Sequence, residues 1–217
     1  MEAAIRSALN QPSGDLTAQQ LESLVNLNAS YHDVANLAGL GAAHNLRYLD
    51  LRYNRLEPLS FPVGLSNLSG LYLSGNQLTE ISLPPDLQGL SVLYLNENQI
   101  SDLSFLAKLP HLQTLDVEYN NLTNLNLPPS RTNLYSLNLA YNLLSPLTLP
   151  TGLAGLEVLS LDDNGLTNLA WPNDLTNLTT LTLSLNQLTD FSFLKLLSNL
   201  QFLDLSANRL TNFSSPG

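Results

Sequence analysis

The stretch LRYLDLRYNRL, residues 46–56, sets a pattern that the chain repeats seven more times. Its four leucines surround Asn54 in the arrangement L-x-x-L-x-L-x-x-N-x-L. Only Ile100 and Val117 depart from leucine at the apolar positions of the eight copies. The asparagine recurs every 22 residues without insertion or deletion, at Asn54, Asn76, Asn98, Asn120, Asn142, Asn164, Asn186 and Asn208. A fixed period of this kind predicts a stack of similar structural units.

The L-x-L core of each copy predicts a short β-strand whose side chains alternate between two sides. Stacked copies would place neighbouring strands ~4.8 Å apart in a parallel sheet. The leucines of one copy cannot be buried alone, but between neighbours they form a continuous core, and each buried leucine contributes roughly 1.5–3 kcal/mol. The pattern therefore predicts a leucine-rich-repeat solenoid, an α/β-type horseshoe or arc with the parallel β-sheet on its concave face.

The recurring asparagine follows each strand, where the chain turns away from the sheet. Its amide can donate and accept at once, so we expect a ladder of hydrogen bonds to the backbone of adjacent turns. Replacement of Asn120 by leucine should then destabilise the fold by ~1–3 kcal/mol, because buried backbone groups lose their partners. A ligand-binding amide is the alternative interpretation.

The convex segments between strands come in two forms. Prolines mark the first form, and because proline has no amide donor we expect these segments to be extended or turn-like. The second form lacks proline before its closing leucine and predicts a short 3₁₀ or α turn, at residues 103–109 and 191–196. Large aromatic side chains in these segments are expected to fill the core behind the sheet: Phe61, Phe105, Trp171 and Phe193. The proline segments lie at residues 83–87, 127–129, 149–150 and 171–172.

Residues 1–23 do not follow the repeat pattern, and their apolar spacing predicts an α-helical N-terminal cap. Ala3 to Leu9 suit a short helix, and the run Thr17-Ala18-Gln19-Gln20 matches a capping box that starts a second helix ending near Leu24. Residues 24–217 then form nine 22-residue repeats, of which the first is degenerate and the last truncated. An open solenoid end exposes leucines, so a polar-backed cap is needed there. No equivalent cap follows the last copy, so we expect self-association through this end or a cover from a longer parent protein.

The formal net charge is −10, and there is no cysteine. An acidic chain argues against nucleic acid or an anionic membrane as partner, and leaves a basic or neutral protein surface open. Without cysteine there is no disulfide, thiolate metal site or cysteine nucleophile. No apolar run of about 18 residues predicts membrane insertion. The start of the chain lacks the basic and apolar regions of a signal peptide, so we expect both ends to be cut from a longer protein.

The N-terminal residues resemble a known family. The stretches AIRSALN (residues 4–10), GDLT (14–17), LESL (21–24) and LNAS (27–30) look like the cap of bacterial leucine-rich-repeat surface and secreted proteins. The repeats are similar to the 22-residue internalin/SDS22-like class, and the resemblance covers essentially the whole chain. It implies protein–protein recognition on the concave sheet and a place outside or on the surface of a bacterium. A cytoplasmic location stays open.

The outward positions of the strands would form a concave face that is open to a partner. Among the tyrosines only Tyr135 falls elsewhere; the face holds Tyr31, Tyr48, Tyr53, Tyr72, Tyr94, Tyr119 and Tyr141. Tyrosine offers a large contact area with few torsions to order, which favours it at interfaces. The alternative is that aromatic residues simply favour strands.

Acidic residues lie beside these tyrosines. Three interpretations compete: a solvated acidic surface, a patch for a basic protein partner, and a Ca²⁺ site, although calcium takes six to eight oxygens from a tight loop. The predicted ligand-binding set combines both residue types: Tyr53, Tyr72, Tyr94, Glu97, Asp116, Glu118, Tyr119, Tyr141, Asp162 and Asp163.

Catalysis needs converging groups in a cleft, and the sequence offers few. We expect none of His32, His44 and His111 on the sheet face, so a Ser-His-Asp arrangement is not expected. Neither a phosphate-binding glycine loop nor zinc-ligand spacing is present. We therefore predict a non-enzymatic protein-binding module without cofactor, metal or catalytic residues. A structural or surface scaffold and a glycan-binding module are the alternatives.

Overall fold

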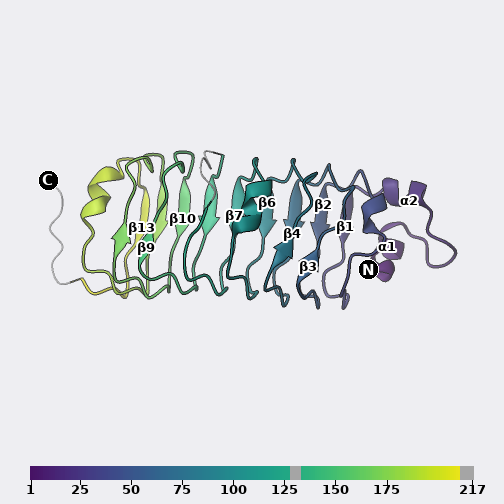
Figure 1. Ribbon diagram of the computed structural model, residues 1–217, viewed down its shortest axis with the longest axis horizontal. Helices are drawn as coiled ribbons and strands as arrows, with labels where there is room; N and C mark the ends of the chain where they lie inside the picture. Colours follow the sequence, from purple (N-terminus) through teal and green to yellow (C-terminus); the bar gives the residue numbers. More distant parts are fainter. Residues whose placement is uncertain (128–132, 211–217) are drawn as a thin grey trace.

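A computed structural model describes residues 1–127 and 133–210 as one solenoid of stacked turns (Figure 1). Its main sheet holds nine parallel strands, one from each turn, in the order β1-β2-β4-β6-β7-β8-β10-β12-β13. Leucine pairs with leucine at the centre of neighbouring strands, as between Leu49 and Leu71. The strands are β1 Asn26–Asn28, β2 Tyr48–Asp50, β4 Gly70–Tyr72, β6 Val92–Tyr94, β7 Thr114–Asp116, β8 Ser136–Asn138, β10 Val158–Ser160, β12 Thr180–Thr182 and β13 Phe202–Asp204.

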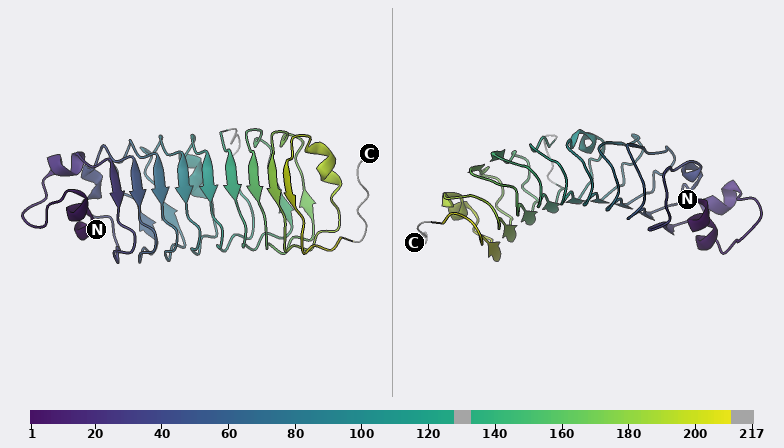
Figure 2. Two further views of the ribbon diagram at one scale, coloured as in Figure 1. Left: turned by 180° about the vertical axis from the view of Figure 1, so that it is seen from behind. Right: turned by 90° about the horizontal axis from the view of Figure 1, so that it is seen from below.

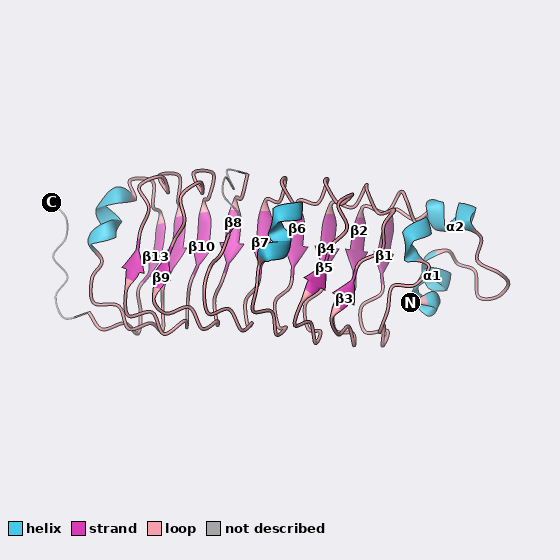
Figure 3. Ribbon diagram, in the orientation of Figure 1, coloured by secondary structure: helices cyan, strands magenta, loops and turns pink. Residues whose placement is uncertain are grey.

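The sheet lines the inner side of the arc, as the right-hand view of Figure 2 shows. Two pairs of short parallel strands form where the sequence carries proline: β3 Leu59–Ser60 with β5 Ile81–Ser82, and β9 Leu147–Thr148 with β11 Leu169–Ala170. Three other convex segments contain 3₁₀ helices (Figure 3): η1 Leu40–Ala42, η2 Ser104–Lys108 and η3 Ser192–Leu196. The predicted solenoid arc and both forms of convex segment are confirmed. In the predicted segment 127–129, residues 128 and 129 lie outside the described residues.

The core runs between the sheet and the convex segments. The central leucines of the strands, such as Leu93, Leu115 and Leu137, have no exposed surface. Phe105 is buried behind the sheet, and Trp171 stacks on Phe193 with ring centroids 4.7 Å apart. Each turn alone would expose these side chains, so burial depends on the neighbouring turns.

The predicted asparagine ladder is present, and Asn120 illustrates it. Its Nδ2 donates to the carbonyl oxygens of Leu95, Val117 and Glu118 at 3.0, 3.1 and 3.1 Å. Its Oδ1 accepts the backbone N–H of Ile100 at 2.8 Å. Each such amide therefore joins two consecutive turns. Its backbone partners are buried and need a hydrogen-bond partner within the protein.

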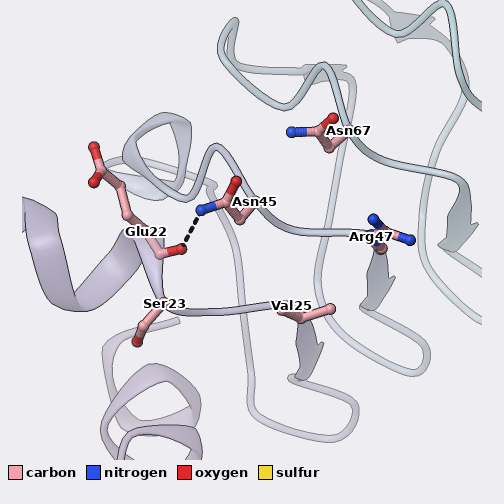
Figure 4. A pocket seen from close by; sticks show the side chains of 6 residues that line it. All are labelled: Glu22, Ser23, Val25, Asn45, Arg47 and Asn67. Carbon is pink, nitrogen blue, oxygen red and sulfur yellow. Dashed lines mark hydrogen bonds between the residues drawn. The ribbon is translucent and has the colours of Figure 1, made fainter.

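A second asparagine ladder, which sequence reasoning missed, runs along the edge before the strands. Each side-chain amide donates to a carbonyl oxygen of the preceding turn, as from Asn45 to Glu22 at 2.8 Å (Figure 4). The signal in the sequence was the asparagine directly before the first leucine of many copies. The members are Asn45, Asn67, Asn133, Asn177 and Asn199.

Two helices precede the sheet, α1 Glu2–Ala8 and α2 Ala18–Glu22. The predicted capping box is confirmed: the Thr17 N–H donates to Gln20 Oε1 at 2.9 Å, and the Gln20 N–H donates to Thr17 Oγ1 at 3.3 Å. Helix α2 ends two residues before the predicted Leu24, because that leucine turns inward and is buried. The boundary of the cap at residue 23 stays a prediction.

The far end of the sheet is more open. On β13 and beyond it, Phe202 and Leu210 keep 55% and 42% of their surface exposed. Residues 211–217 lie outside the described residues. The self-association predicted through this end stays a prediction. Within the part of the chain that the structure describes, no helix is long and apolar enough to cross a membrane.

Candidate binding face on the concave sheet

The residue before each ladder asparagine has a left-handed backbone, as does the residue before His32 at the same place in the first turn, and sequence reasoning missed this conformation. These residues follow the strands as a left-handed column: Tyr31, Tyr53, Gly75, Glu97, Tyr119, Tyr141, Asp163, Leu185 and Ala207. The conformation lets the N–H of Tyr119 reach the Ala140 oxygen at 3.1 Å and then turns the chain so that Asn120 points inward. For L-residues it costs roughly 1–2 kcal/mol, and glycine avoids most of that cost. Four tyrosines nevertheless hold such positions.

The tyrosines on the face stack in pairs from neighbouring turns. Tyr119 and Tyr141 lie parallel, with ring centroids 4.1 Å apart, and Tyr31 and Tyr53 stack at 4.7 Å. Tyr72 and Tyr94, on adjacent strands, meet at 5.3 Å. Stacking orders the rings but does not cover them, and Tyr119 stays 50% exposed. The face therefore presents ordered aromatic surface to the solvent.

Two glycines give the rings room to lie across the next turn. A β-carbon on Gly75 would stand 2.3 Å from Cδ1 of Tyr53, and one on Gly70 would stand 2.7 Å from Cδ1 of Tyr48. Beyond Gly75 the Tyr53 phenol approaches Glu97, whose carboxylate raises the pKa of the phenol. Tyr53 thus links three turns of the left-handed column.

Each turn has four outward positions on the concave face: the first and third residues of its strand and the second and third residues after the strand. Arg52 is the only lysine or arginine at these positions in the nine turns. Its guanidinium binds Asp50 with Nη2 2.6 Å from Oδ2, and its Cζ lies 5.8 Å from the centre of the Tyr72 ring. Burial alone would raise the pKa of Asp50, but hydrogen bonds and charge from Arg52 outweigh it and hold the pKa below its usual value. This end of the face is therefore balanced in charge.

The middle of the face carries carboxylates without a cation. The ion pairs within residues 1–127 and 133–210 include none of Glu97, Asp116 and Glu118. Asp116 accepts the Glu118 N–H at 3.0 Å, and Glu118 accepts from Asn138 Nδ2 at 3.1 Å. Burial nevertheless raises the pKa of both carboxyls above their usual values. These groups are partly desolvated negative charges that a bound cation would stabilise.

The raised pKa of Asp116 predicts a pH-dependent effect of Asp116→Asn. Ionisation of a carboxyl whose pKa is higher in the folded state destabilises that state, so this term is absent at low pH and appears as pH rises through the folded-state pKa. An asparagine can still accept the turn hydrogen bond, as Asn138 does from the Ala140 N–H at 3.1 Å. We expect the variant to melt above the wild type at neutral pH, and the difference in Tm to vanish below the ordinary aspartate pKa. A difference that grows towards acid pH would contradict this, and thermal melts across the pH range measure it.

Asp162 is a half-buried carboxylate on the concave face, and its neighbours hold it in place. Its Oδ2 accepts from the hydroxyls of Ser160, at 2.9 Å, and Thr182. Its Oδ1 accepts both the N–H and the hydroxyl of Ser184, at 2.6 and 2.7 Å. Among the predicted binding residues Asp162 is therefore engaged by the protein itself, whereas the adjacent Asp163 is exposed on the left-handed column.

A depression of about 260 Å³ opens over β2, β4, β6 and β7. It brings together Tyr53, Tyr94 and Asp116 of the predicted set and is completed by Arg52, Ser74 and Asn96. Tyr72, Glu97 and Glu118 are not among its lining residues, and Tyr119, Tyr141 and Asp163 lie further along the face.

A second depression, of about 330 Å³, lies at the edge of the sheet where β1 and β2 begin. Figure 4 shows its lining residues, which include none of the predicted binding residues: Glu22, Ser23, Val25, Asn45, Arg47 and Asn67.

The histidines lie apart from one another. His32, His44 and His111 are exposed; Nδ1 of His32 lies 2.6 Å from the Ser30 oxygen, and Nδ1 of His44 lies 2.9 Å from the Gly64 oxygen. Within the described ranges, no three histidine, aspartate or glutamate side chains are grouped so that they could hold a metal ion.

Comparison with protein families follows the repeat. The model for leucine-rich repeats in two copies matches residues 44–89, 66–108, 88–129 and 154–196, and a single-repeat model matches 199–217. Together these matches span more than half of the chain. The chain belongs to the leucine-rich-repeat family. Leucine-rich-repeat proteins generally act as non-enzymatic protein-binding modules. No curated protein sequence matches this chain.

Solved structures of leucine-rich-repeat proteins are similar over nearly the whole chain. The internalin inlF of Listeria monocytogenes is 27% identical, covering 97% of this chain and 69% of its own, with a TM-score of 0.68. Internalin C2 of the same organism is 26% identical, with coverage of 94% and 91% and a TM-score of 0.59. The leucine-rich-repeat domain of APL1B is 25% identical, with coverage of 94% and 65% and a TM-score of 0.73. The repeats are therefore of internalin-like type.

Proposed function

We propose that this leucine-rich-repeat chain binds a protein ligand on its concave face, as part of a bacterial surface or secreted protein. The contacts are made by stacked tyrosines and the carboxylates beside them, whereas Asp162 is engaged by hydrogen bonds from its own neighbours. The contact set is Tyr53, Tyr72, Tyr94, Glu97, Asp116, Glu118, Tyr119 and Tyr141; Asp163, one turn beyond Tyr141, stays outside it.

The observation that carries this proposal is the use of tyrosine in the left-handed column. Glycine would relieve the backbone strain there, so stability alone does not explain Tyr31, Tyr53, Tyr119 and Tyr141. Each ring is instead ordered by stacking on its neighbour while part of its surface stays in water. Ordered, amphipathic aromatic side chains with little left to immobilise are the residues that dominate protein interfaces. The column therefore favours recognition over simple strand preference.

The test begins with ligands chosen without bias towards this face. Binders are selected from a library of displayed small proteins on the immobilised chain, and their affinity for variants is measured by calorimetry. Tyr94→Ala/Tyr119→Ala should weaken binding by about 30-fold or more, since interface tyrosines are often worth ~2 kcal/mol. Tyr135→Ala is the matched control, because Tyr135 is 48% exposed but stands outside the face. Equal affinity of both variants for the selected binders would refute the proposal.

Tyr119→Gly separates binding from folding. Glycine relieves the left-handed strain, whereas loss of the Tyr141 stack removes about 0.5–1.5 kcal/mol. These opposing effects should leave the free energy of unfolding within ~1 kcal/mol of wild type, while affinity for the selected binder falls at least about tenfold. Denaturant unfolding and calorimetry on the same variant measure the two quantities. A large loss of stability with unchanged affinity would assign Tyr119 to the fold instead.

A further inference from the structure

The solenoid contains a longer period than its 22-residue repeat. The convex elements recur after four turns, four times 22 or 88 residues: β3 at Leu59 matches β9 at Leu147, and β5 at Ile81 matches β11 at Leu169. Likewise η2 begins at Ser104 and η3 at Ser192. Residues 46–122, here called the first block, are therefore structurally equivalent to residues 134–210, the second block.

Contacts that hold the frame agree between the blocks. The Gly64 N–H donates to Asp86 Oδ2 at 2.7 Å, and the Gly152 N–H donates to Asp174 Oδ2 at 2.6 Å. Some exposed residues away from the concave face are also identical at equivalent positions of the two blocks, although packing does not require this. Identical exposed pairs are Thr79 with Thr167, Asp102 with Asp190, Ser104 with Ser192, and Gln113 with Gln201.

The concave face differs between the blocks. Each block has sixteen outward positions, four in each of four turns, and only the pairs Tyr53/Tyr141 and Asp116/Asp204 are identical. Exposed positions away from the face also differ in most pairs, as in Arg47/Tyr135, Glu57/Ser145 and Lys108/Leu196, so what separates the two faces is the kind of residue that each carries. Four of the five tyrosines of the first block are replaced by small residues in the second: Tyr48 by Ser136, Tyr72 by Ser160, Tyr94 by Thr182 and Tyr119 by Ala207.

The replacements make the second block satisfy its own polar groups. Ser160 and Thr182 donate hydrogen bonds to Asp162. The residue equivalent to Asp162 in the first block is Ser74. In the first block the equivalent rings, Tyr72 and Tyr94, stand over the sheet. The first face thus carries more tyrosine rings, whereas the second combines hydroxyl groups bonded to Asp162 with exposed Asp163, Leu185 and Phe202.

The chemistry of the first block suits a cation on a protein chain. Arg52 shows within the molecule how a guanidinium is accommodated there, against a carboxylate and over the Tyr72 ring. Further along, Glu97 and Glu118 supply carboxylates, and Tyr94 and Tyr119 supply ring faces, with no cation of the chain at these outward positions. A cation over an aromatic ring gains roughly 0.5–2 kcal/mol as it loses water.

We infer that recognition is confined to the first block and the adjoining Tyr141, and that the partner is a protein segment bearing arginine or lysine side chains. The second block serves as a spacer of the same curvature. This inference rests on the proposed function of the concave face and names the partner and the part of the face that it contacts.

The two blocks supply matched variants for the test, because each residue introduced already stands at the equivalent position of the same frame. The first-block exchange is Tyr94→Thr/Glu97→Leu/Glu118→Ser/Tyr119→Ala. The second-block exchange is Glu157→Ser/Asp163→Gly. Both remove two carboxylates, so both change the net charge equally. The probe is a fluorescein-labelled peptide of five Arg-Ser pairs, with binding followed by anisotropy at physiological salt, alongside the display-selected binder.

The first-block exchange should weaken peptide binding at least about tenfold, and the second-block exchange by less than about twofold. Equal losses in the two variants would show attraction to net charge alone and would overturn the inference, as would a larger loss in the second. Failure of the wild type to bind the peptide would overturn the basic partner. If the display-selected binder still loses affinity with Tyr94→Ala/Tyr119→Ala, the proposed function stands without the inference; if that binder is also unaffected, both fail.

Discussion

Replacement of Asn120 by leucine is expected to lower the free energy of unfolding by about 3–5 kcal/mol. The Ile100 N–H would lose its bond to Oδ1 and remain buried without a partner, which costs roughly 1–3 kcal/mol. Three further bonds from Nδ2 would be lost, although the Leu95 and Val117 oxygens each keep a bond from a neighbouring ladder amide. The effect exceeds the range expected from the sequence because one amide serves four backbone groups. Urea unfolding followed by circular dichroism measures it.

The matched control for this variant is Asn121→Leu. Asn121 is the next residue and is exposed, and its backbone N–H rather than its side chain bonds to Ile100. Surface substitutions of this kind change stability by about 0.5 kcal/mol or less. If the two variants unfolded at the same urea concentration, the asparagine ladder would not be a source of stability.

Leu115→Ala is also expected to lower the free energy of unfolding, by about 3–5 kcal/mol. Leu115 is fully buried on β7, with Leu93 and Leu137 paired to it on either side. The cavity left behind would be shared by two turns that are held in register by their own hydrogen bonds, so collapse would be limited and the cost near the upper end of the usual range.

Leu143→Ala provides the corresponding control, since Leu143 keeps 59% of its surface exposed. The same chemical change should cost less than about 1 kcal/mol there, because little apolar surface leaves water on folding. A loss at Leu115 no larger than at Leu143 would mean that the inner leucines do not form the continuous core described here.

Periodicity predicted most of the fold. The eight intact copies placed the strands in register, and the proline content of the convex segments separated β3, β5, β9 and β11 from η2 and η3. Both signals are local: apolar alternation specifies a strand, and proline removes a backbone donor. The predicted proline segments adjoin β5, β9 and β11, whereas β3 was not among the segments predicted. The capping box at Thr17 and Gln20 was recognisable for the same reason.

The left-handed column was not predicted, because tyrosine rarely adopts that backbone and gives no signal for it. The sequence signal for this column was the presence of Gly75 and Asp163 directly before a ladder asparagine, because glycine and aspartate tolerate positive φ. The network around Asp162 was missed for a different reason. Its partner Ser160 lies on β10, whereas Thr182 and Ser184 lie on and beside β12. These residues become neighbours only when the two strands pair, so no single stretch of sequence contains the whole network.

The tyrosines of the chain are themselves the reporters for the central claim, that the partner contacts the concave face. Tyrosines are nitrated with tetranitromethane with and without saturating display-selected binder, and each residue is quantified by peptide mass spectrometry. We predict that Tyr94, Tyr119 and Tyr141 lose most of their reactivity in the complex while Tyr135 reacts as before. Protection of Tyr135 with unchanged reactivity at the other three would place the partner elsewhere and contradict the account.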